Sequence, residues 1–450
     1  MKQTIGYKYL DFVAFTNFDL WDVKRYTSRG ISSNFPIVDL GSCIREENKK
    51  YKLSEQSEKE FGILGVNNKE GIFDAYLQRG KDIKQAYKKM EVGWIAYNPY
   101  RINVGSIGIR LEEHQNEYIS PAYVVFSCLE NLSPDFLFLL FKTERFNRII
   151  NENTTGSVRQ NLTVDTLKKL QIPLPSLAEQ EAIVKAYQTK INQAQNLEHQ
   201  AQDLEQEIER YFLNELGIKN VEKRIKTVSL NIIEFNNIEK WGVEFNLGSN
   251  NDSFLSSQIF KNEKLENLVE INPRTNLLEN DKNISFIPME CVSDDFGEII
   301  ELKSKKISES KGYTKFQEND LIWARITPCM QNGKSAIVSN LENKLGCGST
   351  EFHVIRNNNT SNTHTEYIYH ILRLKIVLNR ATSYFTGSAG QQRVPKSFLE
   401  ELVIPVPPID VQVKISNKLS EIKTNIKTNI TQAKNLKHQA EQEFEQAIFS

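Results

Sequence analysis

Cysteine is scarce in this chain, with five in 450 residues. Cys43, Cys128, Cys291, Cys329 and Cys347 are scattered, without a Cys-x-x-Cys pair and without histidines at metal-ligand spacing. This pattern excludes a disulfide-built secreted fold and a structural zinc site. We therefore expect reduced, mostly buried thiols and no bound metal.

Long hydrophobic runs are also missing. The longest runs only from Phe136 to Phe141, whereas a membrane-spanning helix needs about 20 apolar residues. The N-terminus lacks the basic start and apolar core of a secretory signal. These absences predict a cytoplasmic protein without a membrane partner.

An excess of charge of either sign is absent as well. The 56 Lys and Arg residues balance 57 Asp and Glu residues, for a net charge of −1. Charge alone therefore does not indicate nucleic-acid binding. The content of 39% hydrophobic and 25% charged residues is that of a globular protein, and the length has room for two or three domains.

No motif in the sequence is sufficient for catalysis. The G-x-x-x-x-G-K-[ST] phosphate loop is absent, and Asn98-Pro99-Tyr100 lacks one proline of the Asn-Pro-Pro-aromatic motif of amino-methyltransferases. Glu301-Leu302-Lys303 behind Asp294 and Asp295 is similar to a nuclease metal site, but Glu-x-Lys recurs elsewhere in this Lys- and Glu-rich chain. We predict a non-catalytic protein without a cofactor of its own.

What the chain does contain is a long internal repeat. Four sequence features occur twice and in the same order. They are a Phe-x-Asn-x-x-x-Trp-x-Val motif (Phe15–Val23 and Phe235–Val243), a tryptophan (Trp94 and Trp323), a Thr-Gly-Ser motif (Thr155–Ser157 and Thr386–Ser388) and an Ile-Pro-x-Pro motif (Ile172–Pro175 and Ile404–Pro407). The offset grows from 220 to 232 residues along the chain, as small insertions would produce. Because solenoid units have only about 20–50 residues, each copy is a domain. Two similar domains suit a target with two similar halves, such as DNA.

Each copy is expected to be an α+β domain with a curved mixed sheet. Runs of β-type residues predict strands at Ile37–Leu40, Val92–Tyr97, Ala122–Phe126, Leu321–Ala324 and Phe352–Ile355. One helix then follows in each copy, at Asp135–Ile150 and at Glu366–Thr382.

A second, longer helix is expected after each domain. Apolar residues from Ile183 to Tyr211 and from Ile415 to Ala440 follow the three–four step of a heptad seam. The Ala-x-Asn-Leu motif at Ala194 recurs at Ala433. The second motif lies seven residues further from the preceding Ile-Pro-x-Pro than the first one does. An insertion of seven residues, one heptad, keeps the apolar residues on the same face of the helix. The two helices therefore have the pattern of coiled-coil partners, and each Ile-Pro-x-Pro is expected to end a domain and start a helix.

Together these motifs resemble the specificity subunits of type I restriction-modification systems over nearly the whole chain. The resemblance rests on the Thr-Gly-Ser and Ile-Pro-x-Pro motifs and on Glu179-Gln180-x-x-Ile183-Val184, with Gln412 as the counterpart of Gln180 and a departure at Val411, the counterpart of Glu179. It implies two tandem target recognition domains, each followed by a long helix, the two helices pairing as an antiparallel coiled coil. The expected boundaries are 1–172 and 231–404 for the recognition domains, 173–217 and 405–450 for the spacer helices, and 218–230 for a linker.

In function, the resemblance implies a non-catalytic subunit that recognises a bipartite double-stranded DNA sequence. It would direct two methyltransferase subunits, and endonuclease/translocase subunits, to that site, and these partners would use S-adenosylmethionine, ATP and Mg. Two alternatives stay open. One is a related system whose methyltransferase and nuclease are fused, and the other is a coiled-coil adaptor whose domains bind protein instead of DNA.

Residues that read DNA are expected in the loops around the two Gly-Ser motifs. There, small residues stand beside Arg and Gln, the side chains that pair with guanine and adenine: Ser157, Arg159, Gln160, Ser388, Gln391, Gln392 and Arg393. Further cations are candidates for DNA contacts: Arg79, Lys81, Lys88, Lys89 and Arg101 in the first copy, and Arg274, Arg325 and Lys334 in the second.

Overall fold

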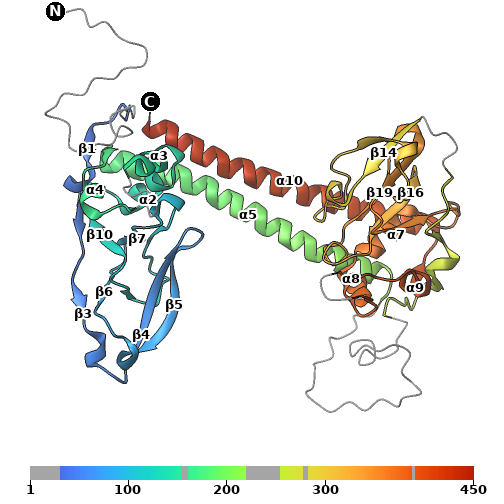
Figure 1. The fold of residues 1–450 in the computed structure, drawn as a ribbon, viewed down its shortest axis with the longest axis horizontal. Helices are drawn as coiled ribbons and strands as arrows, with labels where there is room; N and C mark the ends of the chain where they lie inside the picture. The colour runs from blue at the N-terminus through green and yellow to red at the C-terminus, as the bar shows by residue number, and fades with distance from the viewer. Residues whose placement is uncertain (1–30, 154–160, 219–253, 277–281, 388–390, 450) are drawn as a thin grey trace, which may run out of the picture. The chain divides into compact units, whose positions relative to one another are not determined.

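The computed structural model describes residues 31–153, 161–218, 254–276, 282–387 and 391–449 (Figure 1). The chain divides into two compact units: unit 1 is residues 1–196 with 432–450, and unit 2 is residues 197–431. Within the described ranges, no helix is long and apolar enough to cross a membrane.

Unit 1 is built on three sheets in its described part. The first has the strand order β2 (Ile44–Glu46), β10 (Val124–Cys128), β7 (Ile95–Tyr97) and β8 (Ile107–Ile109). The second has the order β3 (Lys50–Tyr51), β6 (Tyr87–Lys89), β9 (Tyr118–Ile119), β4 (Glu60–Asn67) and β5 (Gly71–Arg79). In the third, β1 (Ile37–Asp39) pairs antiparallel with β11 (Gln171–Pro173).

Unit 2 repeats this plan. Its first sheet has the order β13 (Glu270–Ile271), β20 (Phe352–Arg356), β17 (Leu321–Ala324) and β18 (Ser335–Ile337). Its second has the order β15 (Lys303–Lys306), β14 (Asn283–Ile287), β19 (Leu345–Gly348) and β16 (Thr314–Gln317). In its third, β12 (Lys261–Lys264) pairs antiparallel with β21 (Val403–Val406).

The matching strand order confirms that the repeated motifs mark a duplicated α+β fold. Both second sheets are mixed, because β4 pairs parallel with β9 and β14 pairs parallel with β19. Strands occupy all five segments that the sequence predicts, although two begin later than expected, at Ile95 and Val124.

The single helix predicted in each copy is wrong, because each is two helices. In unit 1, α2 (Pro134–Lys142) and α3 (Glu144–Asn153) meet at Thr143, whose backbone is extended at φ −67° and ψ 146°. The Thr143 hydroxyl donates to the Leu140 carbonyl oxygen at 2.7 Å and accepts from the Phe146 amide at 3.2 Å, so it ends one helix and caps the next. In unit 2, α7 (Thr365–Arg373) and α8 (Lys375–Thr382) meet in the same way at the extended Leu374.

Each Ile-Pro-x-Pro motif begins within a strand, β11 or β21, and does not itself start a helix. Pro173 pairs with Ile37 in the two-stranded sheet, and Pro405 pairs with Asn262. A proline is tolerated there because a strand at the edge of a sheet has amides that need no ladder partner. The long helices begin a few residues later, and the α4 (Val164–Lys168) and α9 (Lys396–Glu401) turns precede the strands.

The long helices are α5 (Leu177–Glu215) and α10 (Ile409–Ile448), and they pair antiparallel (Figure 1). In unit 1, Tyr187 near the start of α5 packs edge-to-face on Phe444 near the end of α10, with ring centres 5.8 Å apart. In unit 2, the end of α5 shares a core with the start of α10, including the seam residues Ala201, Ile415 and Leu419. The predicted coiled-coil pairing is therefore confirmed.

Candidate nucleic-acid interface

A polar groove in unit 2 brings two of the predicted DNA contacts together. It has a volume of about 410 Å³ and lies between the loop after β13, the start of β16, and the segments at the facing ends of β17 and β20. Arg274 and Arg325 both line it, together with Lys315, which the sequence did not single out. Cations beside the Asn272 and Thr350 side chains are the groups that contact DNA phosphates and base edges.

Backbone hydrogen bonds position Arg325, and its side chain lines the groove. Its amide donates to the Glu351 carbonyl oxygen at 2.9 Å, and its carbonyl oxygen accepts from the Val394 amide at 2.8 Å. The side chain is 34% exposed, and its Nε lies 3.7 Å from a Glu351 carboxylate oxygen without a hydrogen bond. The backbone thus orients the side chain, and its exposed part lines the groove although the Nε atom is buried.

Arg393 is held much more firmly than Arg325. Its Nε lies 3.0 and 2.9 Å from the two Glu351 carboxylate oxygens, and a terminal nitrogen donates to Glu351 at 2.7 Å. The other terminal nitrogen donates to the Gln391 carbonyl oxygen at 2.9 Å. The hydrogen bonds from Arg393 lower the pKa of the Glu351 carboxyl, so the pair is ionised. Arg393 therefore stabilises the loop that contains it, and the Glu351 carboxylate contacts both Arg393 and Arg325.

His353 is a buried residue that connects two segments beside the groove, a role that the sequence did not reveal. Its Nδ1 accepts from the Asn272 side-chain nitrogen at 3.0 Å, which leaves Nε2 to donate to the Val394 carbonyl oxygen at 2.9 Å. Burial lowers the pKa of His353 to about 4, so the ring is neutral at physiological pH. It ties the Asn272 loop to the segment after Arg393.

The remaining candidates of unit 2 are more dispersed. Gln392 receives the Thr327 amide on its carbonyl oxygen at 3.0 Å, and Gln391 is exposed. Lys334 donates to the Met289 carbonyl oxygen at 3.4 Å and does not line the groove. Ser388 lies outside the described residues.

In unit 1, one candidate lies in a turn that contacts the described residues following the Gly-Ser motif. Ser157, Arg159 and Gln160 fall outside the described residues. The first residues after them are anchored, because the Leu162 amide donates to the Pro99 carbonyl oxygen at 3.0 Å. Arg101 is exposed in the same turn as Pro99.

The other unit 1 candidates are not brought to that turn. Arg79 pairs with Glu60 at 3.8 Å, and Lys81 pairs with Glu58 at 3.7 Å, both exposed contacts at the open end of the β4–β5 hairpin. Half-buried Lys89 likewise has carboxylate partners.

Lys88 is a structural residue and not a DNA contact. It is 4% exposed, and its Nζ donates to the Tyr123 carbonyl oxygen at 2.9 Å. Burial also lowers the pKa of this amine. Tyr87 and Lys88 of β6 are both buried, which a count of charges along the sequence does not reveal.

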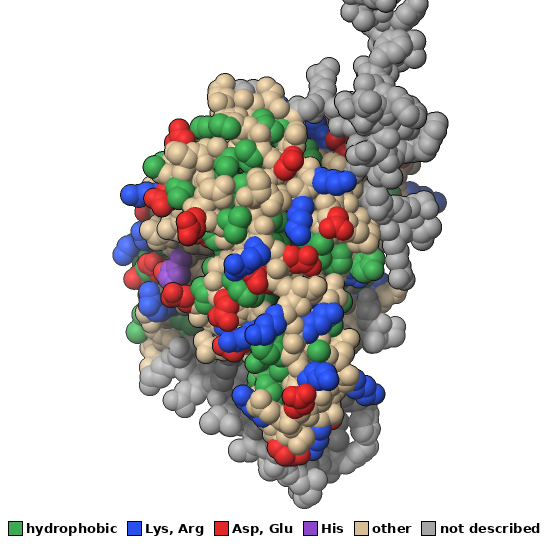
Figure 2. All heavy atoms as spheres, turned by 90° about the vertical axis from the view of Figure 1, so that its left-hand side faces the viewer, with side chains coloured by type: hydrophobic (Ala, Val, Ile, Leu, Met, Phe, Trp, Pro, Cys, Tyr) green, Lys and Arg blue, Asp and Glu red, His purple; other side chains and the backbone are tan. Residues whose placement is uncertain are grey.

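Surface charge is mixed on the face of the molecule that Figure 2 shows. Lys and Arg side chains alternate there with Asp and Glu, and no unbroken basic patch forms. In the described part of the chain, no three His, Cys, Asp or Glu side chains are grouped closely enough to hold a metal. This face therefore offers no broad basic surface.

Known proteins share both the sequence pattern and the fold. The family described as "Type I restriction modification DNA specificity domain" matches twice, at residues 38–209 and 260–438. The EcoEI and EcoAI type I restriction enzyme specificity subunits of Escherichia coli are each 38% identical over 159 residues, which is 35% of this chain. The chain thus spans only 27% of the length of each of these curated relatives.

A solved structure described as "Structural basis underlying complex assembly and conformational transition of the type I R-M system" contains a similar chain. The TM-score is 0.57 at 13% identity, over 93% of this chain and 99% of that one, so this likeness concerns the fold alone. The family matches cover well over half of the sequence, and each contains one four-stranded sheet of the duplicated order. The chain therefore belongs to the family of type I restriction-modification DNA specificity domains.

Proposed function

We propose that this chain is the specificity subunit of a type I restriction-modification system. Each unit recognises one half of a bipartite double-stranded DNA sequence. The observation that carries the proposal is the duplication: the DNA specificity domain matches twice, and both matches contain a first sheet of the same strand order. Two similar readers on one chain suit paired half-sites, as in dimeric DNA-binding proteins.

In this proposal the chain supplies recognition and its partners supply the reactions. Two methyltransferase subunits use S-adenosylmethionine, and endonuclease/translocase subunits use ATP and Mg, in the cytoplasm. The paired helices α5 and α10 serve as spacer and docking surface. Residues 1–172 and 231–404 are the recognition domains, 173–217 and 405–450 the spacer helices, and 218–230 the linker.

The groove in unit 2 is the proposed contact for one half-site. Arg325 is the base-reading side chain, because its guanidinium is oriented but not consumed by Glu351. Arg274 and Lys315 contact phosphates from the two sides of the groove. Arg393, Gln391 and Gln392 are further contacts beside it, Lys334 is a more distant one, and Ser388 is kept as a candidate from the sequence. In unit 1 the corresponding contacts are Arg101 and the Ser157–Gln160 loop, with Arg79 and Lys81 further away.

Footprinting of the chain bound to DNA with its methyltransferase partner tests the proposal. We expect two separate protected half-sites. Affinity should fall steeply between 50 and 200 mM salt, with a log–log slope of about −0.9 for each phosphate contact. A single protected stretch would exclude the two-reader arrangement.

Absence of salt-dependent DNA binding would favour the alternative of a protein-binding adaptor, which the mixed surface charge permits. A partner polypeptide that carries methylation and cleavage together would assign the chain to the related fused system. Co-purification followed by separate methylation and cleavage assays distinguishes the two kinds of system.

A further inference from the structure

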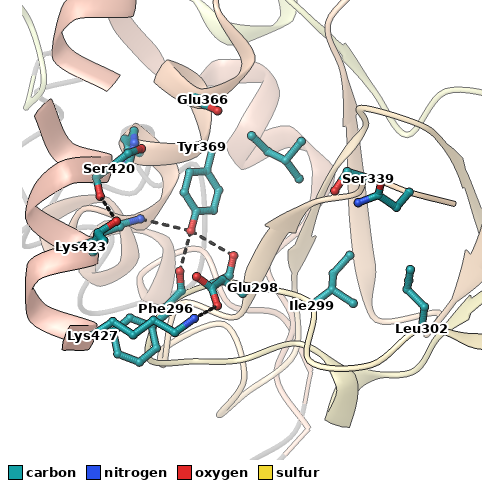
Figure 3. Close-up of a pocket in the computed structure, with 15 residues that line it drawn as sticks. Phe296, Glu298, Ile299, Leu302, Ser339, Glu366, Tyr369, Ser420, Lys423 and Lys427 are labelled. Carbon is teal, nitrogen blue, oxygen red and sulfur yellow. Dashed lines mark hydrogen bonds and ion pairs between the residues drawn. The ribbon is translucent and has the colours of Figure 1, made fainter. Parts of the chain in front are cut away.

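A second cavity of unit 2 contains an amine that has no counter-ion. It has a volume of about 490 Å³ and lies between α10, α7 and the loop that contains Phe296 (Figure 3). It shares no lining residue with the DNA groove. Lys423 lies in its wall, on the side formed by α10.

Lys423 is held by an aromatic ring and a hydroxyl group. Its Nζ donates to the Tyr369 hydroxyl at 3.2 Å and lies 4.3 Å from the centre of the Tyr369 ring. The Tyr369 hydroxyl in turn donates to the Phe296 carbonyl oxygen at 2.9 Å. These contacts fix the amine at the cavity without neutralising it.

Neighbouring lysines on α10 are paired with carboxylates, and Lys423 is not. Lys418 contacts Glu421 at 3.1 Å, and Lys427 contacts Glu298 at 2.7 Å. Among the described residues, no ion pair includes Lys423. The amine is therefore the one on this stretch of α10 that is least stabilised as an ammonium ion.

The surroundings of Lys423 favour the unprotonated amine. Burial, followed by the Arg373 guanidinium, lowers the pKa of Lys423 to about 7, against the opposing effect of Glu298 and Glu366. The neighbouring His370 is also buried and neutral, because burial lowers its pKa well below the usual range. A substantial fraction of Lys423 is thus a free nucleophile at neutral pH.

We propose that Lys423 is a modification site that is acylated by small acyl phosphates entering this cavity. The Nζ lone pair attacks the acyl carbonyl carbon, and a C–N bond forms. The C–O bond to the phosphoryl group breaks, orthophosphate leaves, and the nitrogen loses a proton to solvent. Only a small reagent reaches the amine, because Lys423 lies in the wall of a cavity of about 490 Å³.

Acylation with acetyl phosphate on the full chain tests the proposal. Peptide mass spectrometry over time would follow acetylation at Lys423 and at the ion-paired Lys418. We expect Lys423 to be acetylated at least about tenfold faster. Equal rates at the two lysines would overturn the proposal.

A designed carboxylate separates the effect of the missing counter-ion from simple accessibility. Ser420→Glu places a carboxylate three residues before Lys423 on the wall of the same cavity, a spacing at which helical side chains pair. It should slow acetylation of Lys423 at least about fivefold and leave Lys418 unchanged. Thr428→Glu, exposed one turn further along α10, is the matched control and should change neither rate. A parental rate at Lys423 in Ser420→Glu would overturn the proposal.

Discussion

Gln180 of α5 holds the start of helix α2 at Ser133, whose backbone amide donates to the Gln180 side-chain oxygen at 2.8 Å. The Gln180 side-chain nitrogen donates to the carbonyl oxygens of Asn131 at 3.0 Å and Pro175 at 2.8 Å. Gln180 is fully buried. One amide therefore satisfies three backbone groups where the long helix meets the domain.

Unit 2 repeats these contacts with Gln412 of α10. Gln412 accepts from the His364 amide at 2.9 Å, and it donates to the carbonyl oxygens of Asn362 at 2.9 Å and Pro407 at 2.8 Å. It too is fully buried. In both units, a buried glutamine of the long helix thus makes the same three hydrogen bonds to the backbone.

Replacing either glutamine by leucine should destabilise its own unit. Gln180→Leu or Gln412→Leu leaves three backbone groups without partners, and we expect a loss of at least about 2 kcal/mol in the free energy of unfolding. Urea unfolding followed by circular dichroism measures the loss, and hydrogen exchange at Ser133 or His364 assigns it to one unit. Gln188→Leu on the exposed face of α5 is the control and should have little effect. Equal stability in all three variants would contradict this prediction.

The neutral His353 should make unit 2 less stable in acid. Its pKa is about 4 when folded and about 6.5 when unfolded, so between these values the unfolded chain binds more protons. The contribution to the free energy of unfolding is complete above pH 6.5 and decreases as pH falls to 4, by about 3 kcal/mol.

Urea unfolding between pH 4 and 7 measures this dependence. His353→Gln should flatten it, and what remains should include the similarly buried His370. His438→Gln, on the exposed face of α10, should keep the parental slope. An unchanged slope in His353→Gln would show that another group causes the pH dependence.

Substitutions at the groove should alter one half-site only. We expect Arg325→Ala to remove about 1–3 kcal/mol of discrimination at one base pair, and Arg325→Lys to restore affinity without that discrimination, because lysine cannot make the bidentate contact. Arg393→Ala and Gln391→Ala should impair the same half-site through the loop that Glu351 holds. Methylation of a randomised library with the partner subunit measures site preference. A change in the other half-site would assign these residues to general folding.

Changes in helix length should alter the spacing between half-sites and not their sequences. Deleting the heptad Thr424–Ile430 shortens α10 by about 10 Å and keeps the apolar stripe on one face, so pairing with α5 should persist. Deleting only Thr428–Thr431 rotates the stripe and should disrupt pairing. Methylation of substrates whose half-sites are moved apart one base pair at a time compares the two. Parental spacing in both deletions would show that the helices do not set the distance.

The duplicated fold and the paired helices could be predicted from the sequence because both leave periodic signals. The seam residues Ile415, Leu419 and Ile422 are buried as the heptad requires. Glu179 also has a local explanation, since its carboxylate accepts from the Ser176 amide at 2.8 Å and hydroxyl at 2.7 Å in a capping box. Val411 cannot make these contacts, and the departure in the second copy is therefore confined to a helix cap.

The contacts that depend on distant residues could not be predicted. The break at Thr143 has no glycine or proline to mark it, and the apolar periodicity continues across it. The roles of His353 and Lys423 arise from what packs against them, which no local pattern encodes. Arg393 looked like a free cation in the sequence because its partner Glu351 lies 42 residues away.

The core of unit 1 has a consequence for how the protein is synthesised. Phe444, Ile448 and Phe449 belong to the same core as Phe136, whose ring centre lies 5.9 Å from that of Phe444. At about 5–20 residues per second, on the order of tens of seconds separate the translation of Phe136 from that of Phe444. The domain that leaves the ribosome first thus waits with exposed aromatic side chains until Phe449 has been added. Chaperone binding to nascent chains should be greatest in that interval.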